Sequence, residues 1–218
     1  RESHPFPTRR SSDLIEFSAV ELLQLRHALI TNESIESIEL ENIEIGQDVW
    51  QLLGESLSLN GSVKIFRASN TNLNNNISAL EDIINFSTSI EQLIISNHKE
   101  GNDIVATVGY ALVKNTKLKE LVLTNNDLKS SGIEFITQII KLNKSIVDID
   151  ISHQKLSSKF LKDLSDVIQK NETLTLLSLN NNQLDYASLK RLAEGLVDNS
   201  NITTLNLSHN NISYSSSF

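Results

Sequence analysis

Apolar residues recur at fixed positions along most of the chain. An eleven-residue segment places them at its first, fourth and sixth positions, and its clearest copies read LKELVLTNNDL, LTLLSLNNNQL and ITTLNLSHNNI. Successive copies start 28, 27, 28, 28, 28 and 28 residues apart. Because chance does not keep such a register, the pattern predicts an array of repeats. The seven copies begin at Ile35, Val63, Ile90, Leu118, Ile146, Leu174 and Ile202.

Each period contains two kinds of hydrophobic spacing. Residues 121–123 show the alternation of a short, half-buried strand. Later in the same period, Ile133, Ile136 and Ile140 have the i, i+3, i+7 spacing of an amphipathic helix. We therefore expect a right-handed α/β solenoid, a horseshoe with parallel strands on its inner face and helices on its outer face. A deletion within residues 74–78 explains the one short period.

Asparagines recur at two positions of the period. One set stands three residues before each strand segment, where Asn tolerates the left-handed conformation that ends a helix. A second set takes the ninth position, and we expect its amides to bond backbone groups that would otherwise be buried unpaired. Ile43 takes this position in the first segment and cannot donate or accept. We predict left-handed C-caps at Asn32, Asn60, Asn115, Asn143, Asn171 and Asn199, and backbone-bonding amides at Asn126, Asn182 and Asn210.

The pattern L-x-x-L-x-L-x-x-N-x-L with a 28-residue period resembles the ribonuclease-inhibitor-like class of leucine-rich repeats over residues 19–212. That class includes ribonuclease inhibitors, tropomodulins, capping-protein regulators, Ran GTPase-activating proteins and the sensor regions of NOD-like receptors, and similar arrays occur in bacterial effectors. The resemblance implies the horseshoe fold. It specifies function poorly, because the matching residues are the buried ones and members of the class differ on the exposed ones.

The first fourteen residues, RESHPFPTRRSSDL, differ in composition from the rest of the chain. They hold both prolines, and the helical spacing of residues 20–30 would place Pro7 where a buried aliphatic residue belongs. HPFPTRRSSDL also resembles a translated sequencing adapter. We expect residues 1–14 to be an artefact or a tail, 15–213 to be the repeat domain and 214–218 to be a truncated tail. Both ends are interpreted as cut, with flanking domains lost.

The composition argues against several classes of function. The formal net charge of −8 disfavours nucleic acid or an anionic membrane as the main partner. No apolar run approaches the roughly 18 residues of a membrane-spanning helix. The chain has no cysteine for a disulfide, a thiol nucleophile or a zinc–cysteine site. We expect a cytoplasmic monomer. Nine Asn-x-Ser/Thr sequons occur, and we interpret most of them as chance in an asparagine-rich chain.

No motif predicts catalysis. The sequence has no Gly-rich phosphate loop and no Ser-His-Asp spacing. His153 and His209 share the eighth position of their segments, but an intervening repeat places them roughly 10 Å apart, too far to share a metal ion. Trp50 falls on the helix stripe, so we expect it in the core. We therefore predict no cofactor, no metal site and no enzymatic activity.

The remaining candidate is the exposed inner face of the strands. Its fifth-position row has an apolar centre, Ile94 and Val122, bordered by charged residues, which is typical of a protein-binding surface. The alternatives are a GTPase-activating protein, an actin or capping-protein regulator, or a bacterial effector repeat domain. We predict that this face binds a partner protein through Glu39, Arg67, Ile94, Glu120, Val122, Asp148, Asp150, His153, Ser178 and Asn206.

Overall fold

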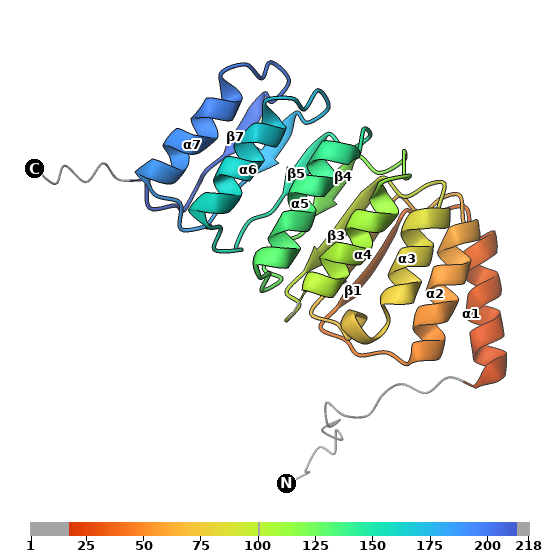
Figure 1. The fold of residues 1–218 in the computed structure, drawn as a ribbon. Coiled ribbons are helices and arrows are strands. Elements are labelled where there is room, and N and C mark those ends of the chain that lie inside the picture. Colours follow the sequence, from red (N-terminus) through yellow and green to blue (C-terminus); the bar gives the residue numbers. More distant parts are fainter. Residues whose placement is uncertain (1–17, 100, 213–218) are drawn as a thin grey trace, which may run out of the picture.

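The computed structural model describes residues 18–99 and 101–212, in which helices and strands alternate along the chain (Figure 1). The expectations for residues 1–14 and 214–218 lie outside the described residues. The strands are β1 (Ser37–Glu41), β2 (Ile65–Ser69), β3 (Gln92–Ser96), β4 (Glu120–Val122), β5 (Asp148–Asp150), β6 (Leu176–Ser178) and β7 (Thr204–Asn206). The helices are α1 (Ala19–Thr31), α2 (Gln47–Leu59), a short 3-10 helix η1 (Leu73–Asn75), α3 (Ile77–Phe86), α4 (Asn102–Leu112), α5 (Ser130–Leu142), α6 (Ser158–Ile168) and α7 (Tyr186–Leu196).

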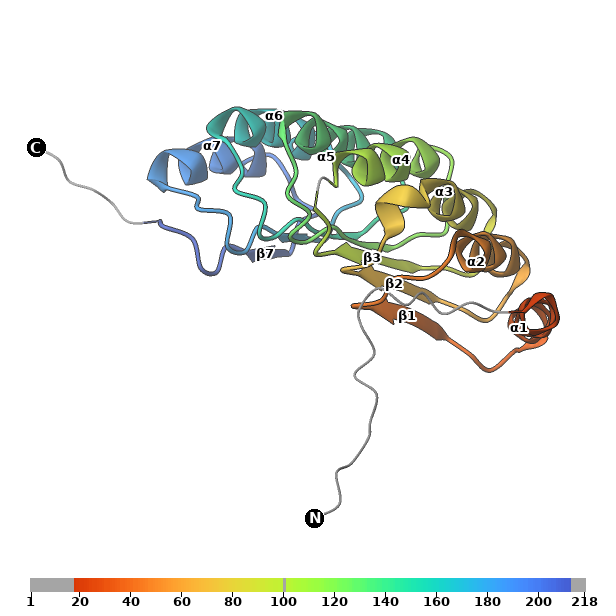
Figure 2. The same cartoon turned by 90° about the horizontal axis from the view of Figure 1, so that it is seen from below.

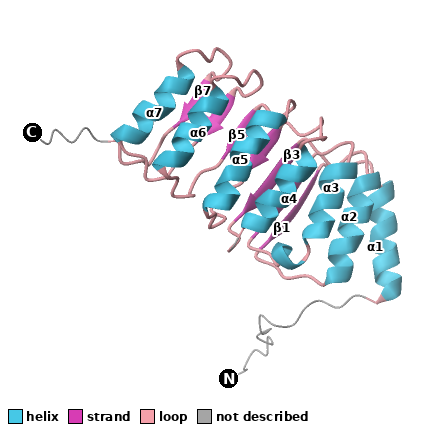
Figure 3. Cartoon of the chain, viewed as in Figure 1, coloured by secondary structure: helices cyan, strands magenta, loops and turns pink. Residues whose placement is uncertain are grey.

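The strands of the described region form one parallel sheet in chain order, from β1 to β7. Figure 2 shows the strands along the inner side of an arc and the helices along its outer side. Figure 3 shows the helices lying in a row over the strands. The α/β solenoid that the hydrophobic pattern predicts is therefore confirmed, with its parallel sheet inside and its helices outside.

The register of the sheet follows the repeat period. Glu39 pairs with Arg67, which lies 28 residues further along the chain, and Arg67 pairs with Ile94 after only 27 residues. The position of the short period, between the second and third copies, is therefore confirmed. The 3-10 helix η1 overlaps the start of the 74–78 segment where we placed the deletion, and α3 begins at Ile77 within that segment.

The core lies between the strands and the helices. Leu121 and Ile149 pair in adjacent strands and are fully buried. Ile136 and Leu164, on the stripes of α5 and α6, are fully buried as well, and Trp50 is buried in α2 as predicted. Burying each such side chain is worth roughly 1.5–3 kcal/mol. Each repeat thus stabilises the array by covering the apolar surface of its neighbours.

The asparagines that precede the strands do not have the left-handed backbone that we predicted. Asn60 and Asn143 have φ angles of −72° and −74°. The capping is done by the side chain: Asn143 Oδ1 accepts hydrogen bonds from the backbone N–H groups of Ser145 and Ile146, both at 2.8 Å. Because this amide satisfies the turn directly, a left-handed residue is not needed there. The same two bonds recur at Asn32, Asn60, Asn115, Asn171 and Asn199.

Left-handed residues occur instead just after the strands, at the eighth position, where φ lies between 49° and 62°. The chain turns inward there and buries the ninth residue. Asn126 Oδ1 accepts from the backbone N–H of His98 at 3.1 Å, and Asn126 Nδ2 donates to the carbonyl of Ile95 at 2.9 Å. The predicted role of the ninth-position asparagines is therefore confirmed. The left-handed residues at the eighth position are Asn42, Asn70, Asn97, Asn125, His153, Asn181 and His209.

In the first repeat the side chain of Ile43 cannot form hydrogen bonds, so another residue bonds the backbone groups of the turn. Asn72 from the following repeat donates through Nδ2 to the carbonyl of Ile45 at 2.8 Å and accepts from the Ile45 N–H at 3.3 Å. The same Asn72 Oδ1 accepts from Trp50 Nε1 at 3.0 Å. The side chain of Asn72, from the next repeat, thus forms hydrogen bonds with both the backbone groups of Ile45 and the buried indole N–H of Trp50.

Several sequons have a structural origin. The sequon asparagines Asn60, Asn143 and Asn171 are buried, and their Nδ2 atoms donate to backbone carbonyls of the preceding repeat. The hydroxyl two residues later also takes part, since Ser145 Oγ donates to Asn143 Oδ1 at 3.0 Å and to the Asn115 carbonyl at 3.2 Å. The Asn-x-Ser/Thr spacing at these sites therefore builds the turn between helix and strand rather than arising by chance.

Candidate partner-binding face

The inner face of the sheet is built from two rows of outward-pointing strand residues. Strand pairing aligns the fifth-position row, which runs Glu39, Arg67, Ile94, Val122, Asp150, Ser178 and Asn206. The third-position row runs beside it and contains Glu120 and Asp148. The alternation of a strand places both rows on the side away from the helices. Nine of the ten candidate residues therefore share one face.

Two of the candidates are less exposed than we predicted. Ile94 and Ser178 each retain only 5% of their accessible surface. The neighbours of Ile94 in the same row are Arg67 and Val122, both half-buried. The expected exposed apolar centre is therefore reduced to Val122. Ile94 belongs to the floor of the face rather than to its surface.

A cleft lies on this face over strands β4 to β7. It has a volume of about 800 Å³. Six of the ten candidate residues line it: Glu120, Val122, Asp148, Asp150, Ser178 and Asn206. Glu39, Arg67 and Ile94 lie on the N-terminal half of the face, outside this cleft. The structure thus brings together the candidates of the C-terminal half and separates them from the others.

The candidates outside the cleft are engaged with their own neighbours. Arg67 Nε lies 3.5 Å from a carboxylate oxygen of Glu39 and 3.6 Å from one of Glu41, so the basic group is already neutralised. His153 occupies the turn after β5 with φ 62°, and its Nδ1 lies 2.7 Å from Asn181 Nδ2. Both side chains thus already make contacts within the face itself.

Hydrogen bonds fix the side chains on the floor of the cleft. Asp150 Oδ1 accepts from the backbone N–H of Ser152 at 2.9 Å and also from the Ser152 hydroxyl. Ser152 Oγ lies 3.1 Å from Ser178 Oγ, and Asn206 Nδ2 donates to Ser178 Oγ at 3.3 Å. A continuous polar chain therefore crosses β5, β6 and β7. It holds these groups in place before any partner arrives.

The cleft carries negative charge. Glu120, Asp148 and Asp150 project into it from neighbouring strands. Within the described residues, no Lys, Arg or His forms an ion pair with any of the three. Asp148 accepts one hydrogen bond, from the Thr175 hydroxyl at 2.9 Å. The three carboxylates thus remain available to a positively charged group from outside.

The candidate residues omitted several members of the cleft. Leu176 is half-buried at its centre, and Thr204 and Ser208 border it on the last repeat. The signal for Leu176 was present, because the third position of a segment faces the same side as the fifth.

Two kinds of site are absent from the described part of the chain. Residues 18–99 and 101–212 contain no group of three or more His, Asp or Glu side chains placed to hold a metal ion. None of the helices described has the length and the apolar character needed to cross a membrane.

A family model agrees with the repeat. Residues 114–136 and 198–215 match the sequence model of the leucine-rich repeat. No curated protein matches the chain. Among solved structures, the tropomodulin C-terminal domain of Caenorhabditis elegans is similar, with 16% identity, a TM-score of 0.42, and coverage of 82% of this chain and 92% of that domain. Actin-binding site 2 of leiomodin-1 is similar with 14% identity, a TM-score of 0.47, and coverage of 83% and 91%.

At such low sequence identities and TM-scores, the similarity to these two structures identifies no binding partner for this chain. The two matched segments begin at the ends of α4 and α7 and run through the strands that follow, β4 and β7. They therefore fall at the same place in two repeats of the array. Together with a seven-stranded open parallel sheet that alternates with helices, they support a leucine-rich repeat protein.

Proposed function

We propose that the chain is a non-catalytic protein-interaction module whose cleft over β4–β7 binds a segment of a partner protein. The observation that supports this most is the cleft of about 800 Å³, which lies on the predicted face and is lined by six of the predicted residues. That volume is in the range of sites that hold a ligand or several side chains. The binding unit would be residues 15–213, in the ribonuclease-inhibitor-like class, acting as a cytoplasmic monomer.

The chemistry of the cleft favours a basic partner segment. Glu120, Asp148 and Asp150 offer carboxylate oxygens without a cation partner among the described residues. Carboxylates form strong, charge-assisted hydrogen bonds with Lys and especially Arg. Val122 and Leu176 supply half-buried apolar surface beside them. The partner segment should therefore combine one or more Lys or Arg residues with an apolar side chain.

The rigidity of the cleft supports the same proposal. Its side chains stand on paired strands, and the chain of hydrogen bonds from Asp150 through Ser152 and Ser178 to Asn206 fixes its floor. A preorganised surface loses little conformational entropy when a partner binds. The cleft can therefore bind an extended or helical segment without rearranging its own backbone.

The test compares two triple variants of equal charge. Glu120→Gln, Asp148→Asn and Asp150→Asn remove the cleft carboxylates but keep their size and most hydrogen-bond acceptors. Glu81→Gln, Asp166→Asn and Glu194→Gln remove three exposed carboxylates from helices α3, α6 and α7. Peptides are first selected on the unchanged protein from a displayed random library, and their Kd is then measured for all three proteins.

We expect the selected peptides to be rich in Lys and Arg and to lose at least tenfold in affinity only with the cleft variant, since truncating a charged contact costs about 2 kcal/mol or more. Peptides that bind both variants alike would refute the cleft as the site. Actin, capping protein and small GTPases are added as separate arms to test the alternatives. Acceleration of GTP hydrolysis by the purified chain would refute the non-catalytic assignment.

A further inference from the structure

The loops that join the helices to the strands form one rim of the solenoid, and in the middle repeats this rim is basic. The segment 113–119 follows α4, and the segment 141–147 comprises the last two residues of α5 and the loop after it; together they contain five lysines and no acidic residue. Lys170 follows α6 on the same rim. We name this set the lysine rim: Lys114, Lys117, Lys119, Lys141, Lys144 and Lys170.

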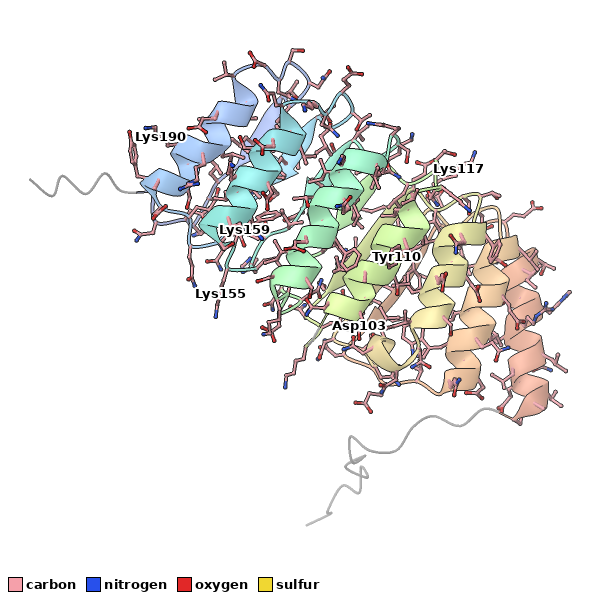
Figure 4. The ribbon with its side chains drawn as sticks, viewed as in Figure 1. Asp103, Tyr110, Lys117, Lys155, Lys159 and Lys190 are labelled. Carbon is pink, nitrogen blue, oxygen red and sulfur yellow. The ribbon has the colours of Figure 1, made fainter. Side chains whose placement is uncertain are left out.

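Hydrogen bonds between repeats hold these loops side by side. Asn143 Nδ2 donates to the carbonyl of Leu112 at 2.7 Å and to that of Asn115 at 3.0 Å, which joins the two loops. Asn171 Nδ2 donates to the carbonyl of Ile140 at 2.9 Å, which adds the third loop. The lysines are therefore gathered by the fold itself. Figure 4 shows Lys117 beside the C-terminal end of α4, whereas Lys155 and Lys159 lie beside the N-terminal end of α6, on the opposite side of the helix layer.

Among the described residues, no ion pair neutralises the lysine rim. All six lysines are exposed, and none forms an ion pair with a described residue. Three exposed acids lie beside these lysines: Glu91 on the preceding repeat, Glu172 in the same loop as Lys170, and Asp198, which accepts a hydrogen bond from Gln169. The net charge of −8 for the whole chain thus hides a local positive surface, because it averages over the acidic cleft and this rim.

Apolar side chains project from the same rim. Phe86 is 61% exposed at the end of α3, Val113 is 50% exposed just after α4, and Leu142 is 46% exposed at the end of α5. Leu59 continues the row at the end of α2, at 62% exposure. Exposed apolar side chains gathered in this way mark an interaction surface.

Two cavities are described beneath these side chains, and both are very small. The two cavities beneath the rim, beside Asn115 and beside Asn143, have volumes of about 10 Å³ and about 0 Å³. Neither can accept a side chain from an acidic protein. Phe86 is the one aromatic residue among the exposed apolar residues of the rim, so stacking with the bases of a nucleic acid has little support. Protruding apolar groups interspersed with lysines match instead the boundary of an anionic bilayer, where apolar side chains enter the acyl region and lysines meet the headgroups.

We propose that the lysine rim, with Phe86, Val113 and Leu142, binds the surface of an anionic lipid bilayer. The solenoid lies on the bilayer by one rim, so the concave cleft stays open to its partner. Each lysine near such a surface strengthens binding about fivefold, and clusters of four to eight basic residues are typical of this mode. The binding is peripheral and needs no membrane-spanning helix.

The test is flotation of the full chain with vesicles of phosphatidylcholine alone or with about 30% phosphatidylserine, a strongly anionic surface. The rim variant carries Lys114→Gln, Lys117→Gln, Lys141→Gln and Lys144→Gln. The control variant carries Lys155→Gln, Lys159→Gln, Lys162→Gln and Lys190→Gln. Each takes the net charge from −8 to −8 − 4 = −12, so both lose the same charge at different places; the control also removes the exposed ion pair between Lys159 and Glu134. Circular dichroism checks that both are folded.

We expect the unchanged chain to bind the anionic vesicles and not the neutral ones, the rim variant to bind at least tenfold more weakly, and the control to bind as the unchanged chain does. A further variant with Phe86→Gln and Leu142→Gln should bind severalfold more weakly while keeping the salt dependence. Equal losses in the rim and control variants would overturn the proposal. So would capture of polyglutamate or RNA by the rim without capture of vesicles.

Discussion

The side-chain amide of Asn143 donates a hydrogen bond to the backbone carbonyl of Leu112 across 2.7 Å. Leu112 ends α4, and Asn143 stands 31 residues later at the end of α5. The same 31-residue bond joins Asn60 to Leu29 and Asn171 to Ile140. In these repeats one asparagine therefore satisfies the helix end of the preceding repeat, so neighbouring repeats are joined by hydrogen bonds as well as by apolar packing.

Replacing this asparagine should destabilise the array. Asn143→Ala removes donors from the carbonyls of Leu112 and Asn115 and an acceptor from the N–H groups of Ser145 and Ile146. Leaving buried backbone groups unpaired costs about 1–3 kcal/mol each, part of which water recovers. We expect the free energy of unfolding in urea to fall by about 2–4 kcal/mol. The control is Asn85→Ala at an exposed site, which should change it by less than about 0.5 kcal/mol.

Ser87 is the position where this device is missing. It stands at the end of α3 in place of the recurring asparagine, and its Oγ accepts from the N–H groups of Ser89 and Ile90 at 3.4 and 3.3 Å. A serine hydroxyl is too short to reach the preceding repeat as well. Ser87→Asn should therefore raise the free energy of unfolding by about 0.5–1.5 kcal/mol. Unfolding at an unchanged urea concentration would show that the shortened repeat cannot hold the amide in this geometry.

The strands and their neighbours could be predicted because burial repeats along the chain. Leu121 and Ile149 occupy the same position of two segments, and stacking identical units is the only way to bury both. The conformation of the asparagines could not be predicted in the same way. Asn suits both a side-chain cap and a left-handed backbone, so the sequence shows that Asn143 and Asn125 matter without showing that only Asn125 has positive φ.

The exposure of single residues on the inner face was also beyond the sequence. Alternation along a strand predicts that Ile94 and Ser178 point away from the helices, and the pairing confirms this. It does not predict how far the neighbouring side chains of the row cover them. Both are 5% exposed for that reason. The grouping of Glu120, Asp148 and Asp150 could be predicted, because consecutive parallel strands in register place equivalent residues side by side.

Close helix packing in the last repeats makes Gly195 sensitive to substitution. A Cβ atom at Gly195 would contact the carbonyl oxygen of Ser165 below any normal separation and would lie 2.7 Å from Ser165 Oγ. Because the contact is with the backbone of α6, a rotamer change cannot relieve it. Gly195→Ala should lower the free energy of unfolding by about 1–3 kcal/mol. The matched control is Gly61→Ala, whose Cβ would have no neighbour within 4 Å and should cost less than about 0.5 kcal/mol.

His98 should make the stability of the protein depend on pH. It takes the ninth position of the third repeat, 4% exposed, with its Nε2 3.2 Å from the carbonyl of Ala68. Burial lowers the pKa of His98 below its usual value of 6.5, although hydrogen bonds with backbone groups of Ala68 and Thr71 partly oppose this shift. The folded chain therefore keeps His98 neutral at a pH where the unfolded chain already binds a proton.

The sign follows from proton binding. Between the usual pKa and the lowered pKa of His98, the unfolded state binds more protons than the folded state. The stability that neutral His98 contributes is therefore fully present above about pH 6.5 and is lost as the pH falls through the lowered pKa of His98. We expect urea unfolding at about pH 5.5 to need less denaturant than at about pH 7.5. His98→Asn introduces the residue that the next repeat has at the same position, Asn126. It should remove most of that difference in denaturant concentration and keep the hydrogen bonds of the turn. His27→Asn, at an exposed site on α1, should leave the difference intact. If the pH dependence of stability is unchanged in His98→Asn, it arises from the carboxylates and the role given to His98 is wrong.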